Sequence, residues 1–237
     1  AICYTGRVGI LDFLFPTYCV RCRKIGSYVC PNCFAMISFS QDRICLVCNR
    51  ASYDGLTHPK CRGKHVIDGS FTSIDYKGTV KKLLYTFKYK PYVSSLKVLL
   101  ADLFYEGLIQ QEGFMRALST NPVLVPIPLH VTRLRQRGYN QSEILAIELG
   151  KKFDLPIENL LTRTKKTISQ FGLKREARIE NVKGAFCARS KKLEARSYQG
   201  IFLIDDIMTS GSTFLECAYV LKKAGVKRVW GMALARD

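Results

Sequence analysis

The sequence has no apolar run that approaches the ~20 residues of a membrane-spanning helix. Its first residues also lack the basic start, the apolar core and the small-residue cleavage site of a signal peptide. We therefore expect no transmembrane segment and a cytoplasmic protein. Acidic residues are scarce: 19 Asp and Glu stand against 37 Lys and Arg, which gives a net charge of +18. This balance favours polyanionic partners such as nucleic acid, phosphorylated ligands or an anionic membrane surface.

Cysteine, in contrast, is abundant and unevenly placed. Seven of the ten cysteines lie between Cys19 and Cys61, and six of these form Cys-x-x-Cys pairs. In a cytoplasmic protein this pattern indicates metal binding rather than disulfides. Buried free thiols or a redox role are the alternatives, but redox pairs usually occur singly. The pairs are Cys19 with Cys22, Cys30 with Cys33 and Cys45 with Cys48, and His58 and Cys61 repeat the same spacing.

The spacing of these residues suits structural zinc. Tetrahedral zinc takes four thiolate or imidazole ligands, so two pairs complete one closed site. A segment of this length with few large apolar side chains buries too little surface to fold alone, which also favours metal. We therefore expect a double zinc module over residues 1–66 with about two zinc ions. Pairing in sequence order gives one site from Cys19, Cys22, Cys30 and Cys33, and a second from Cys45, Cys48, His58 and Cys61.

Two questions about this module stay open at the level of sequence. The pairs could interleave rather than follow sequence order, and His65 competes with His58 as the histidine ligand. The module is also basic and carries several aromatic residues, which suits nucleic-acid binding and an interaction or folding role equally.

Residues 201–213 have the order of a strand, a loop and a helix. Four apolar residues at 201–204 predict a buried strand, and two carboxylates, Asp205 and Asp206, follow. A turn of small hydroxylated residues around Gly211 comes next, and apolar residues at helical spacing then run towards Gly225. In open α/β sheets, ligands bind beyond the carboxyl ends of the strands. A ligand site is therefore expected at this turn.

The residue types at this turn suit a ribose 5-phosphate. Backbone N–H groups and hydroxyls at the start of a helix can bind a phosphate, and Gly211 lets the backbone approach it. Asp205 and Asp206 can accept hydrogen bonds from vicinal sugar hydroxyls or hold water on Mg²⁺. No Gly-Lys-Ser/Thr follows, so this is not a Walker loop. The alternative is a buried strand that ends in a solvated acidic turn.

Arginines supply a second expected anion site in the region 122–237. Arg133, Arg135 and Arg137 follow a predicted strand at 123–128, so they would lie near the same edge of the sheet. Residues 163–196 are rich in bases and predict either a solvated loop or a lid that carries Lys174, Arg175 and Arg178 over an anion. Further expected elements are a helix at 142–153, a short strand at 157–161 and a strand at 226–234.

Residues 67–121 are expected to form a helical connector or hood, with a strand at 71–76, helices from Val80 to Phe87 and at 95–111, and a loop at 112–122. From Lys77 to Lys97 there are six lysines and no acids, interleaved with Tyr85, Tyr89 and Tyr92. Such a surface suits single-stranded DNA, because lysines meet phosphates and rings stack on bases. The alternative is a solvated helix face with core tyrosines.

Together these motifs resemble known families. Residues 201–213 resemble the signature by which type I phosphoribosyltransferases bind 5-phosphoribosyl 1-pyrophosphate (PRPP). The segments 14–22, 125–130, 135–141 and 170–186, taken with this signature, resemble the ComF competence-protein family. One departure is His58, where many relatives have a cysteine.

The resemblance implies a type I phosphoribosyltransferase-like parallel sheet flanked by helices, with a small N-terminal double zinc ribbon. The domains would be 1–66, 67–121 and 122–237. It further implies PRPP binding with Mg²⁺, a role in handling DNA during natural transformation, and other DNA-uptake proteins as partners. The expected PRPP-binding residues are Asp205, Asp206, Met208, Thr209, Ser210, Gly211, Ser212, Thr213, Arg135, Arg137, Arg175 and Arg178, with Asp205 and Asp206 catalytic if the protein turns over.

Two other functions compete with this one. A nucleobase phosphoribosyltransferase of purine salvage would need a hood that stacks on a base, and no pattern in the sequence indicates one. A pure interaction protein with a vestigial ligand site is the other, and the intact Asp205-Asp206 pair and the loop at 209–213 argue against it.

Overall fold

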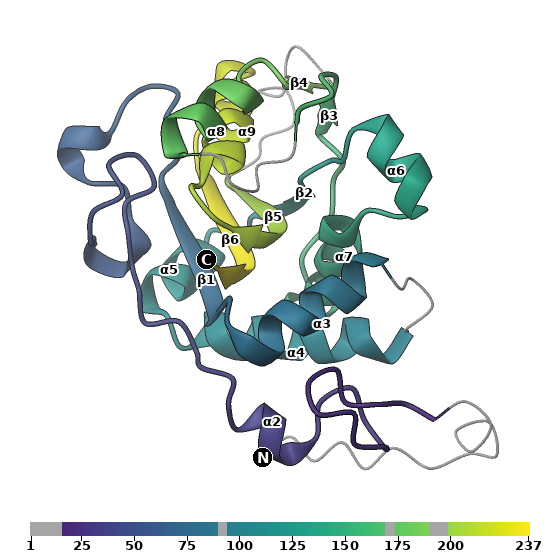
Figure 1. Cartoon of the computed structure of the whole chain (residues 1–237). Helices are drawn as coiled ribbons and strands as arrows, with labels where there is room; N and C mark the ends of the chain where they lie inside the picture. Colours follow the sequence, from purple (N-terminus) through teal and green to yellow (C-terminus); the bar gives the residue numbers. More distant parts are fainter. Residues whose placement is uncertain (1–15, 90–93, 169–173, 190–198) are drawn as a thin grey trace.

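A computed structural model describes residues 16–89, 94–168, 174–189 and 199–237 (Figure 1). Its centre is a parallel four-stranded sheet in the order β1-β6-β5-β2. The expected α/β fold with a parallel sheet is therefore confirmed. The strands are β1 (Gly69–Asp75), β2 (Val123–Pro126), β5 (Ile201–Met208) and β6 (Val229–Arg236).

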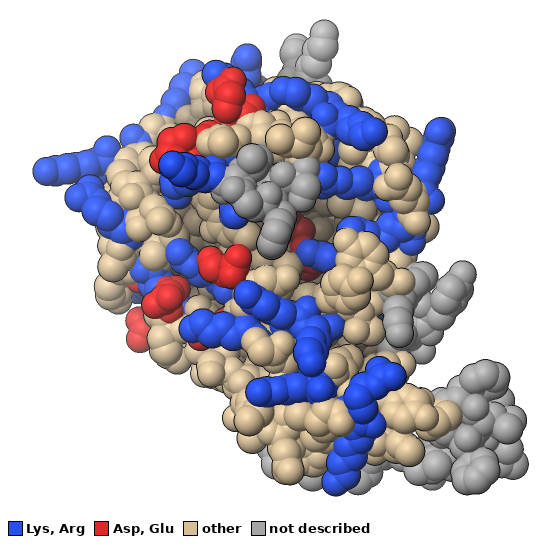
Figure 2. Space-filling model, viewed as in Figure 1, with Lys and Arg blue, Asp and Glu red and all other residues tan. Residues whose placement is uncertain are grey.

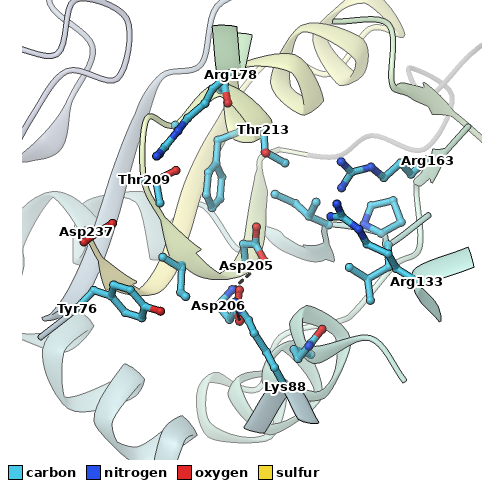
Figure 3. Close-up of a pocket in the computed structure, with 18 of the residues that line it drawn as sticks. Tyr76, Lys88, Arg133, Arg163, Arg178, Asp205, Asp206, Thr209, Thr213 and Asp237 are labelled. Atoms are coloured by element: carbon cyan, nitrogen blue, oxygen red, sulfur yellow. Dashed lines mark hydrogen bonds and ion pairs between the residues drawn. The ribbon is translucent and has the colours of Figure 1, made fainter. Parts of the chain in front are cut away.

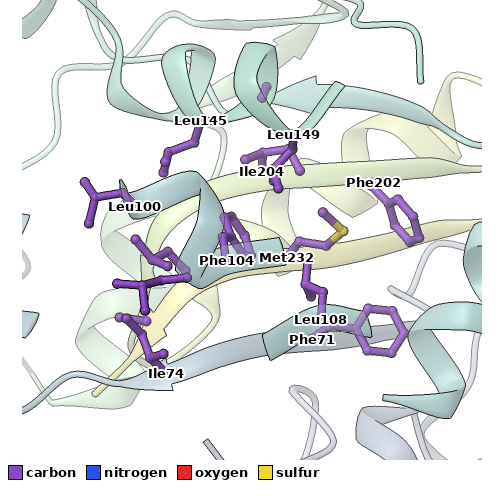
Figure 4. Packing of buried hydrophobic residues seen from close by; sticks show 14 of the residues in the cluster. Phe71, Ile74, Leu100, Phe104, Leu108, Leu145, Leu149, Phe202, Ile204 and Met232 are labelled. Atoms are coloured by element: carbon purple, nitrogen blue, oxygen red, sulfur yellow. The ribbon is translucent and has the colours of Figure 1, made fainter. Parts of the chain in front are cut away.

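Helices cover both faces of the sheet because residues along the central strand β5 alternate between two cores. Phe202 and Ile204 pack in a buried cluster with the first helical layer (Figure 4). Ile201 and Leu203 pack on the opposite face with the last helix. The first layer contains α3 (Gly78–Tyr89), α4 (Ser94–Ile109), α5 (Glu112–Leu118) and α7 (Gln141–Phe153), and the opposite face carries α9 (Ser212–Lys223).

Three expected elements differ from the structure. The segment expected as a loop at 112–122 contains α5, whose Phe114 is fully buried. The short strand expected at 157–161 is reduced to a parallel bridge between Ile157 and Leu124 of β2. β3 (Leu161–Arg163) follows it and forms an antiparallel hairpin with β4 (Phe186–Ala188), outside the main sheet. The basic segment at 163–196 contains β4 and α8 (Arg175–Val182), so its described part is not a structureless loop. Packing against the larger domain overrode weak local periodicity in each case.

The segment expected as a connector lies within the sheet domain, since β1 pairs with β6 and α3 and α4 pack on the same sheet. The outer edge of β1 is in turn covered by the N-terminal chain. Ser40 donates its backbone N–H to the Ser73 carbonyl at 2.8 Å, and Asp75 donates to Ser38 at 3.0 Å. The zinc module therefore protects the sheet edge, which would otherwise expose unpaired backbone groups.

The zinc module itself contains the short helices α2 (Pro31–Phe34), η1 (Tyr53–Gly55) and η2 (Pro59–Cys61). Figure 1 shows its first half below α3 and α4 and its second half on the side of α8. In the described part of the chain, no helix combines the length and the apolar character needed to cross a bilayer. Residues 14–15, Tyr92 and Gln170, named above in sequence motifs, lie outside the described residues.

Candidate functional site

Two groups of potential metal ligands form in sequence order. Cys19, Cys22, Cys30 and Cys33 make one group, and Cys45, Cys48, His58 and Cys61 make the other; within each group the ligand atoms all lie within 4.8 Å of one another. Four sulfurs about 2.3 Å from a tetrahedral zinc would lie roughly 3.8 Å apart, so the donor set and its spacing fit structural zinc. The interleaved pairing is not the arrangement that the structure contains.

The histidine of the second group is His58. Its Nδ1 lies 3.3 Å from the Cys48 sulfur, and its Nε2 lies 3.0 Å from the Ala51 carbonyl. A zinc-ligating histidine commonly donates a hydrogen bond from its second ring N–H to such a carbonyl, which fixes the ring orientation. His65 instead packs edge-on against Tyr219, at 5.6 Å between ring centroids.

The two groups are built on a repeated turn. Bridging residues Tyr18 and Ile25 frame the first knuckle, residues 18–25, and Ile44 and Ala51 frame the second knuckle, residues 44–51, 26 positions later. In each, the residue after the second cysteine, Arg23 or Asn49, has a left-handed backbone. The repeat makes equivalent positions of the two knuckles natural controls for each other.

A cavity of about 290 Å³ opens at the carboxyl ends of β2, β5 and β6 (Figure 3). Its walls come from α3, the β2–α6 segment, α7, the end of β5 and the start of α9, where α6 is Val131–Arg137. This is the edge at which open α/β sheets bind ligands. The polar lining residues are Tyr76, Lys88, Arg133, Arg137, Gln141, Arg163, Arg178, Asp205, Asp206, Thr209, Ser212, Thr213 and Asp237.

Asp205 is fixed at the floor of this cavity by α7. Ser142 donates its hydroxyl to Asp205 Oδ1 at 2.8 Å, and the Asp206 backbone N–H donates to the same oxygen at 2.8 Å. Asn140 caps α7 and donates its amide to the Ile127 carbonyl at 3.0 Å, which anchors the helix start to the end of β2. Burial, and then the neighbouring Asp206 charge, raise the pKa of Asp205 to about 7.

Asp206 has a different partner, Lys88 near the end of α3. The Lys88 Nζ lies 2.8 Å from Asp206 Oδ2, and both side chains are largely shielded, with exposed fractions of 24% and 10%. Burial opposes the charged form of Lys88, but the Asp206 carboxylate outweighs it, so the pKa of Lys88 is raised. One carboxylate of the acidic pair is therefore neutralised by an ammonium from the helical layer.

Unpaired donors gather at the wall next to α6. Arg133 donates to the Thr167 carbonyl at 3.2 Å, and Arg163 donates to the Thr167 hydroxyl. Thr167 therefore fixes both guanidinium groups through hydrogen bonds. Burial lowers the pKa of Arg163, and the charge of Arg133 lowers it further. The Nε of Arg163 and the Nε2 of Gln141 are buried without a hydrogen-bond partner among the described residues. Two confined cations with spare donors favour an anion here.

The loop at residues 209–213, called the phosphate loop below, forms the opposite wall. Gly211 has a φ of 74°, in the left-handed region that favours glycine, and precedes the first residue of α9. A Cβ at this position would lie 2.7 Å from Leu46 Cδ2, so a side chain there would also clash. Thr209, Gly211, Ser212 and Thr213 line the cavity where α9 begins, and helix N-termini are common anion-binding positions.

The structure brings many of the expected binding residues to one cavity: Asp205, Asp206, Thr209, Gly211, Ser212, Thr213, Arg137 and Arg178 all line it. Four others, all described residues, do not. Met208 is buried in the core, and Arg135 is exposed on α6. Ser210 and Arg175 contact each other behind the loop, where Arg175 donates to the Ser210 carbonyl at 3.2 Å.

Lys88, Arg163 and Gln141 are cavity residues that sequence reasoning did not assign to the site. Lys88 had been placed on the lysine-rich surface of α3, but it lies on Asp206 instead. A local signal existed only for Gln141, which belongs to the motif at 135–141. The other two reach the cavity from elements distant in sequence, and no periodicity reports that.

An aromatic surface lies beside the cavity on α3. The rings of Tyr85 and Tyr89 are 4.8 Å apart, with exposed fractions of 65% and 61%. The guanidinium of Arg137, a cavity residue, lies 5.6 Å from the Tyr89 ring centroid. Figure 2 shows lysines and arginines around the hollow and over the first half of the zinc module below it. Exposed rings with bordering cations therefore continue outward from the cavity.

Comparison with known proteins adds independent observations. A family model described as a double zinc ribbon domain matches residues 10–62. "Competence protein F" of Haemophilus influenzae is 39% identical over 121 residues, and this match covers 50% of the chain and 52% of that protein. The chain thus spans about half the length of this relative in the match.

Other similar proteins carry the name "DNA utilization protein YhgH". The Escherichia coli K12 protein is 27% identical over 227 residues, covering 88% of the chain and 96% of that protein. The Salmonella typhi protein is 34% identical over 139 residues, covering 54% of the chain and 57% of that protein. The double zinc ribbon ahead of a parallel α/β sheet and these relatives along the chain together support a protein of the ComF family.

Proposed function

We propose that this protein takes part in competence and DNA uptake, binding PRPP or a related ribose phosphate in the cavity and single-stranded DNA on the adjoining surface. Relatives named for competence and DNA utilization support the process. The observation that best supports a ribose phosphate as the ligand is the cavity itself. It has a carboxylate pair on its floor, a glycine-containing helix N-terminus on one wall and two partly buried arginines on the other.

Each part of PRPP has chemically matched residues. Asp205 and Asp206 would accept hydrogen bonds from the ribose hydroxyls, and the phosphate loop would donate backbone N–H groups to the 5-phosphate. Arg133, Arg163 and Gln141 would then hold the pyrophosphate. Arginines with fixed partners suit this role because they need little reorganisation to bind two phosphate oxygens. If the bound ligand turns over, these same contacts would stabilise the charge that develops as pyrophosphate leaves.

Magnesium fits this site only as part of the ligand complex. The described residues contribute no group of three or more carboxylate, histidine or cysteine ligands here. Mg²⁺ commonly binds through one or two carboxylates together with substrate phosphates. We therefore propose that Mg²⁺ arrives on the pyrophosphate, with Asp205 and Asp206 holding its water, and supplies charge neutralisation.

The DNA part of the proposal is carried by Tyr85 and Tyr89. Exposed tyrosines that lie ring to ring offer a face on which a nucleobase can stack, and the flanking Arg137, Lys81 and Lys82 can neutralise phosphates. Lys88 no longer belongs to this surface, because it is engaged by Asp206. The single-stranded DNA would therefore contact the two tyrosine rings on the protein surface, and the cavity would remain open to a small ligand.

Calorimetric titration of PRPP with and without Mg²⁺ tests the ligand proposal. We expect binding by the parent protein and a loss of about 2–4 kcal/mol in the Asp205→Asn, Asp206→Asn double variant, because hydrogen bonds to charged acceptors are each worth ~1.5–3 kcal/mol and do not add fully. Asp42→Asn, at an exposed carboxylate in the zinc module, is the matched control. Parent affinity in the double variant would refute the assignment of this site.

The same preparation distinguishes the alternative of a purine-salvage phosphoribosyltransferase. Incubation with PRPP, Mg²⁺ and each free purine base, followed by pyrophosphate measurement, reports transfer. Release of pyrophosphate that depends on one base, and that stops in the double variant, would establish that alternative. PRPP binding without such release supports a ligand-binding role.

A further inference from the structure

The second knuckle, residues 44–51, lies directly behind the phosphate loop. Leu46, the residue after the first cysteine of the knuckle, is 1% exposed and belongs to the same buried cluster as Met208 and Phe214. These two residues flank the phosphate loop in sequence. Leu46 also occupies the space that a Cβ on Gly211 would need. A residue of the zinc knuckle thus forms the back wall of the loop.

Arg175 joins the same two segments through hydrogen bonds. Its Nη2 donates to the carbonyls of Leu46 at 2.7 Å and Val47 at 3.0 Å, both between the zinc-ligand cysteines of the knuckle. Its Nη1 donates to the Ser210 carbonyl in the phosphate loop at 3.2 Å. One planar guanidinium therefore ties two adjacent carbonyls of the knuckle to a loop carbonyl more than a hundred residues later in the chain.

Within the described residues, the first knuckle makes no equivalent contact with the loop. In the first zinc site, the Arg21 carbonyl accepts from Lys82 at 3.4 Å, and the Cys33 carbonyl accepts from Thr79 at 3.3 Å. Both donors belong to α3. Val20, which is equivalent to Leu46 in the repeat, packs against the core of the helical layer rather than against the loop.

We propose that Arg175 is a positioning residue and that zinc at the second site, but not at the first, sets the conformation and anion affinity of the phosphate loop. The knuckle holds its turn through the bound metal, because a ribbon of this size does not keep its fold without it. When the second site loses zinc, Leu46 and the two carbonyls bound by Arg175 lose their positions, and the loop loses its back wall. Only the identity of the anion, PRPP, rests on the proposed function.

Paired variants test this coupling. Arg175→Met removes all three hydrogen bonds and leaves every zinc ligand in place. Arg175→Lys keeps the positive charge but cannot bridge the same carbonyls in one plane. Cys48→Ser weakens the second site, and Cys22→Ser, at the equivalent position of the repeat, weakens the first. For each protein the zinc content, the amide hydrogen exchange of residues 209–213 and the affinity for PRPP are measured.

We expect Arg175→Met to retain the zinc content of the parent, to exchange the loop amides faster and to bind PRPP about tenfold more weakly, since charge-assisted hydrogen bonds are among the stronger ones. Arg175→Lys should behave like the methionine variant, because position rather than charge is lost. Cys48→Ser should show the same loop exchange and affinity loss, whereas Cys22→Ser should leave both unchanged.

Three results would overturn the proposal: parent-like loop exchange in Arg175→Met, full rescue by Arg175→Lys, or equal effects of Cys22→Ser and Cys48→Ser. If a cysteine variant fails to fold, the two Arg175 variants still decide whether this arginine positions the phosphate loop, since neither substitution changes a zinc ligand. If the parent binds no PRPP, the proposed ligand is wrong, but the exchange measurements on the loop still decide whether the knuckle positions it.

Discussion

Lys88 and Asp206 form an ion pair of 2.8 Å between the end of α3 and the floor of the cavity. The pair joins the helical layer to the strand that carries the acidic residues, and it neutralises one of two adjacent carboxylates. A ribose phosphate must therefore bind to an acidic pair of which one member already has a cationic partner. An ammonium group has three N–H donors, so Lys88 can donate to the ligand as well as to Asp206.

The first prediction concerns this pair. Lys88→Met leaves Asp206 without its counter-charge beside Asp205, so we expect the free energy of unfolding at pH 7.5 to fall by about 1–3 kcal/mol; full burial would give more, and the pair is partly exposed. Adding Asp206→Asn should restore most of the loss, which urea unfolding of the double-mutant cycle would measure. Lys97→Met, which breaks a more exposed pair with Glu148, should cost less than ~1 kcal/mol. Equal losses in the two lysine variants would contradict this account.

The second prediction follows from Asp205. Its pKa of about 7 exceeds the ordinary value of 3.8, so the folded state binds this proton more tightly than the unfolded state. Stability from this group is therefore present below about pH 4 and is lost as the pH rises towards 7. Asp205→Asn removes this pH-dependent loss. We therefore expect the free energy of unfolding of the variant, relative to that of the parent, to increase by about 1–2 kcal/mol as the pH rises from 5 to 8. Thermal unfolding across this range, with Asp42→Asn as the control, checks the trend. A constant difference between variant and parent would show that the Asp205 pKa is ordinary.

The third prediction concerns the zinc content. Elemental analysis of the purified protein should find about two zinc ions per chain, one for each group of four ligands. Cys45→Ser should release about one of them and loosen the second half of the zinc module without unfolding the sheet, because the main core is built from other residues. Protein without zinc, or with disulfides among these cysteines when freshly purified under reducing conditions, would contradict the assignment.

The fourth prediction compares two arginines on α6. Arg133 lines the cavity and contacts Thr167, whereas Arg135, two residues later, is exposed and does not line it. We expect Arg133→Met to weaken PRPP binding by ~1.5–3 kcal/mol, as for a hydrogen bond to a charged group. Arg135→Met should change it by less than about 0.5 kcal/mol, which is usual for surface sites. Calorimetric titration of both variants with PRPP measures these losses. A larger loss of affinity in Arg135→Met would favour Arg135, as the sequence predicted, as the binding residue.

The fifth prediction concerns single-stranded DNA. Binding should weaken linearly with the logarithm of salt, with a slope of ~0.7 per phosphate contact, and Lys81→Gln with Lys82→Gln should flatten it. Tyr89→Ala should cost ~1–3 kcal/mol of affinity without changing the slope, because stacking is not electrostatic. Tyr219→Ala is the matched control, since this exposed tyrosine also lies near a lysine but on α9. Unchanged affinity in Tyr89→Ala would assign the exposed rings no part in binding.

Local patterns in the sequence were sufficient to predict the parts of this protein that depend on neighbouring residues. The cysteine pairs, the buried strand before Asp205, the helix that Asn140 caps and the turn at Gly211 all follow from spacing and backbone preference. These interactions act over a few residues, so the chain records them as motifs. They were enough to predict zinc and a ligand site after the buried strand, whereas the parallel sheet as a whole was implied by the family resemblance.

Only the tertiary structure decided which cations reach that site. Lys88 and Arg163 arrive in the cavity from α3 and β3, whereas Arg135 and Arg175, which belong to predicted binding segments, point elsewhere. A side chain's environment depends on how distant elements pack, and neither charge nor periodicity along the chain encodes that geometry. For the same reason no motif indicated that the second knuckle supports the phosphate loop: Leu46 and Gly211 meet only because the zinc ribbon folds back onto the sheet domain.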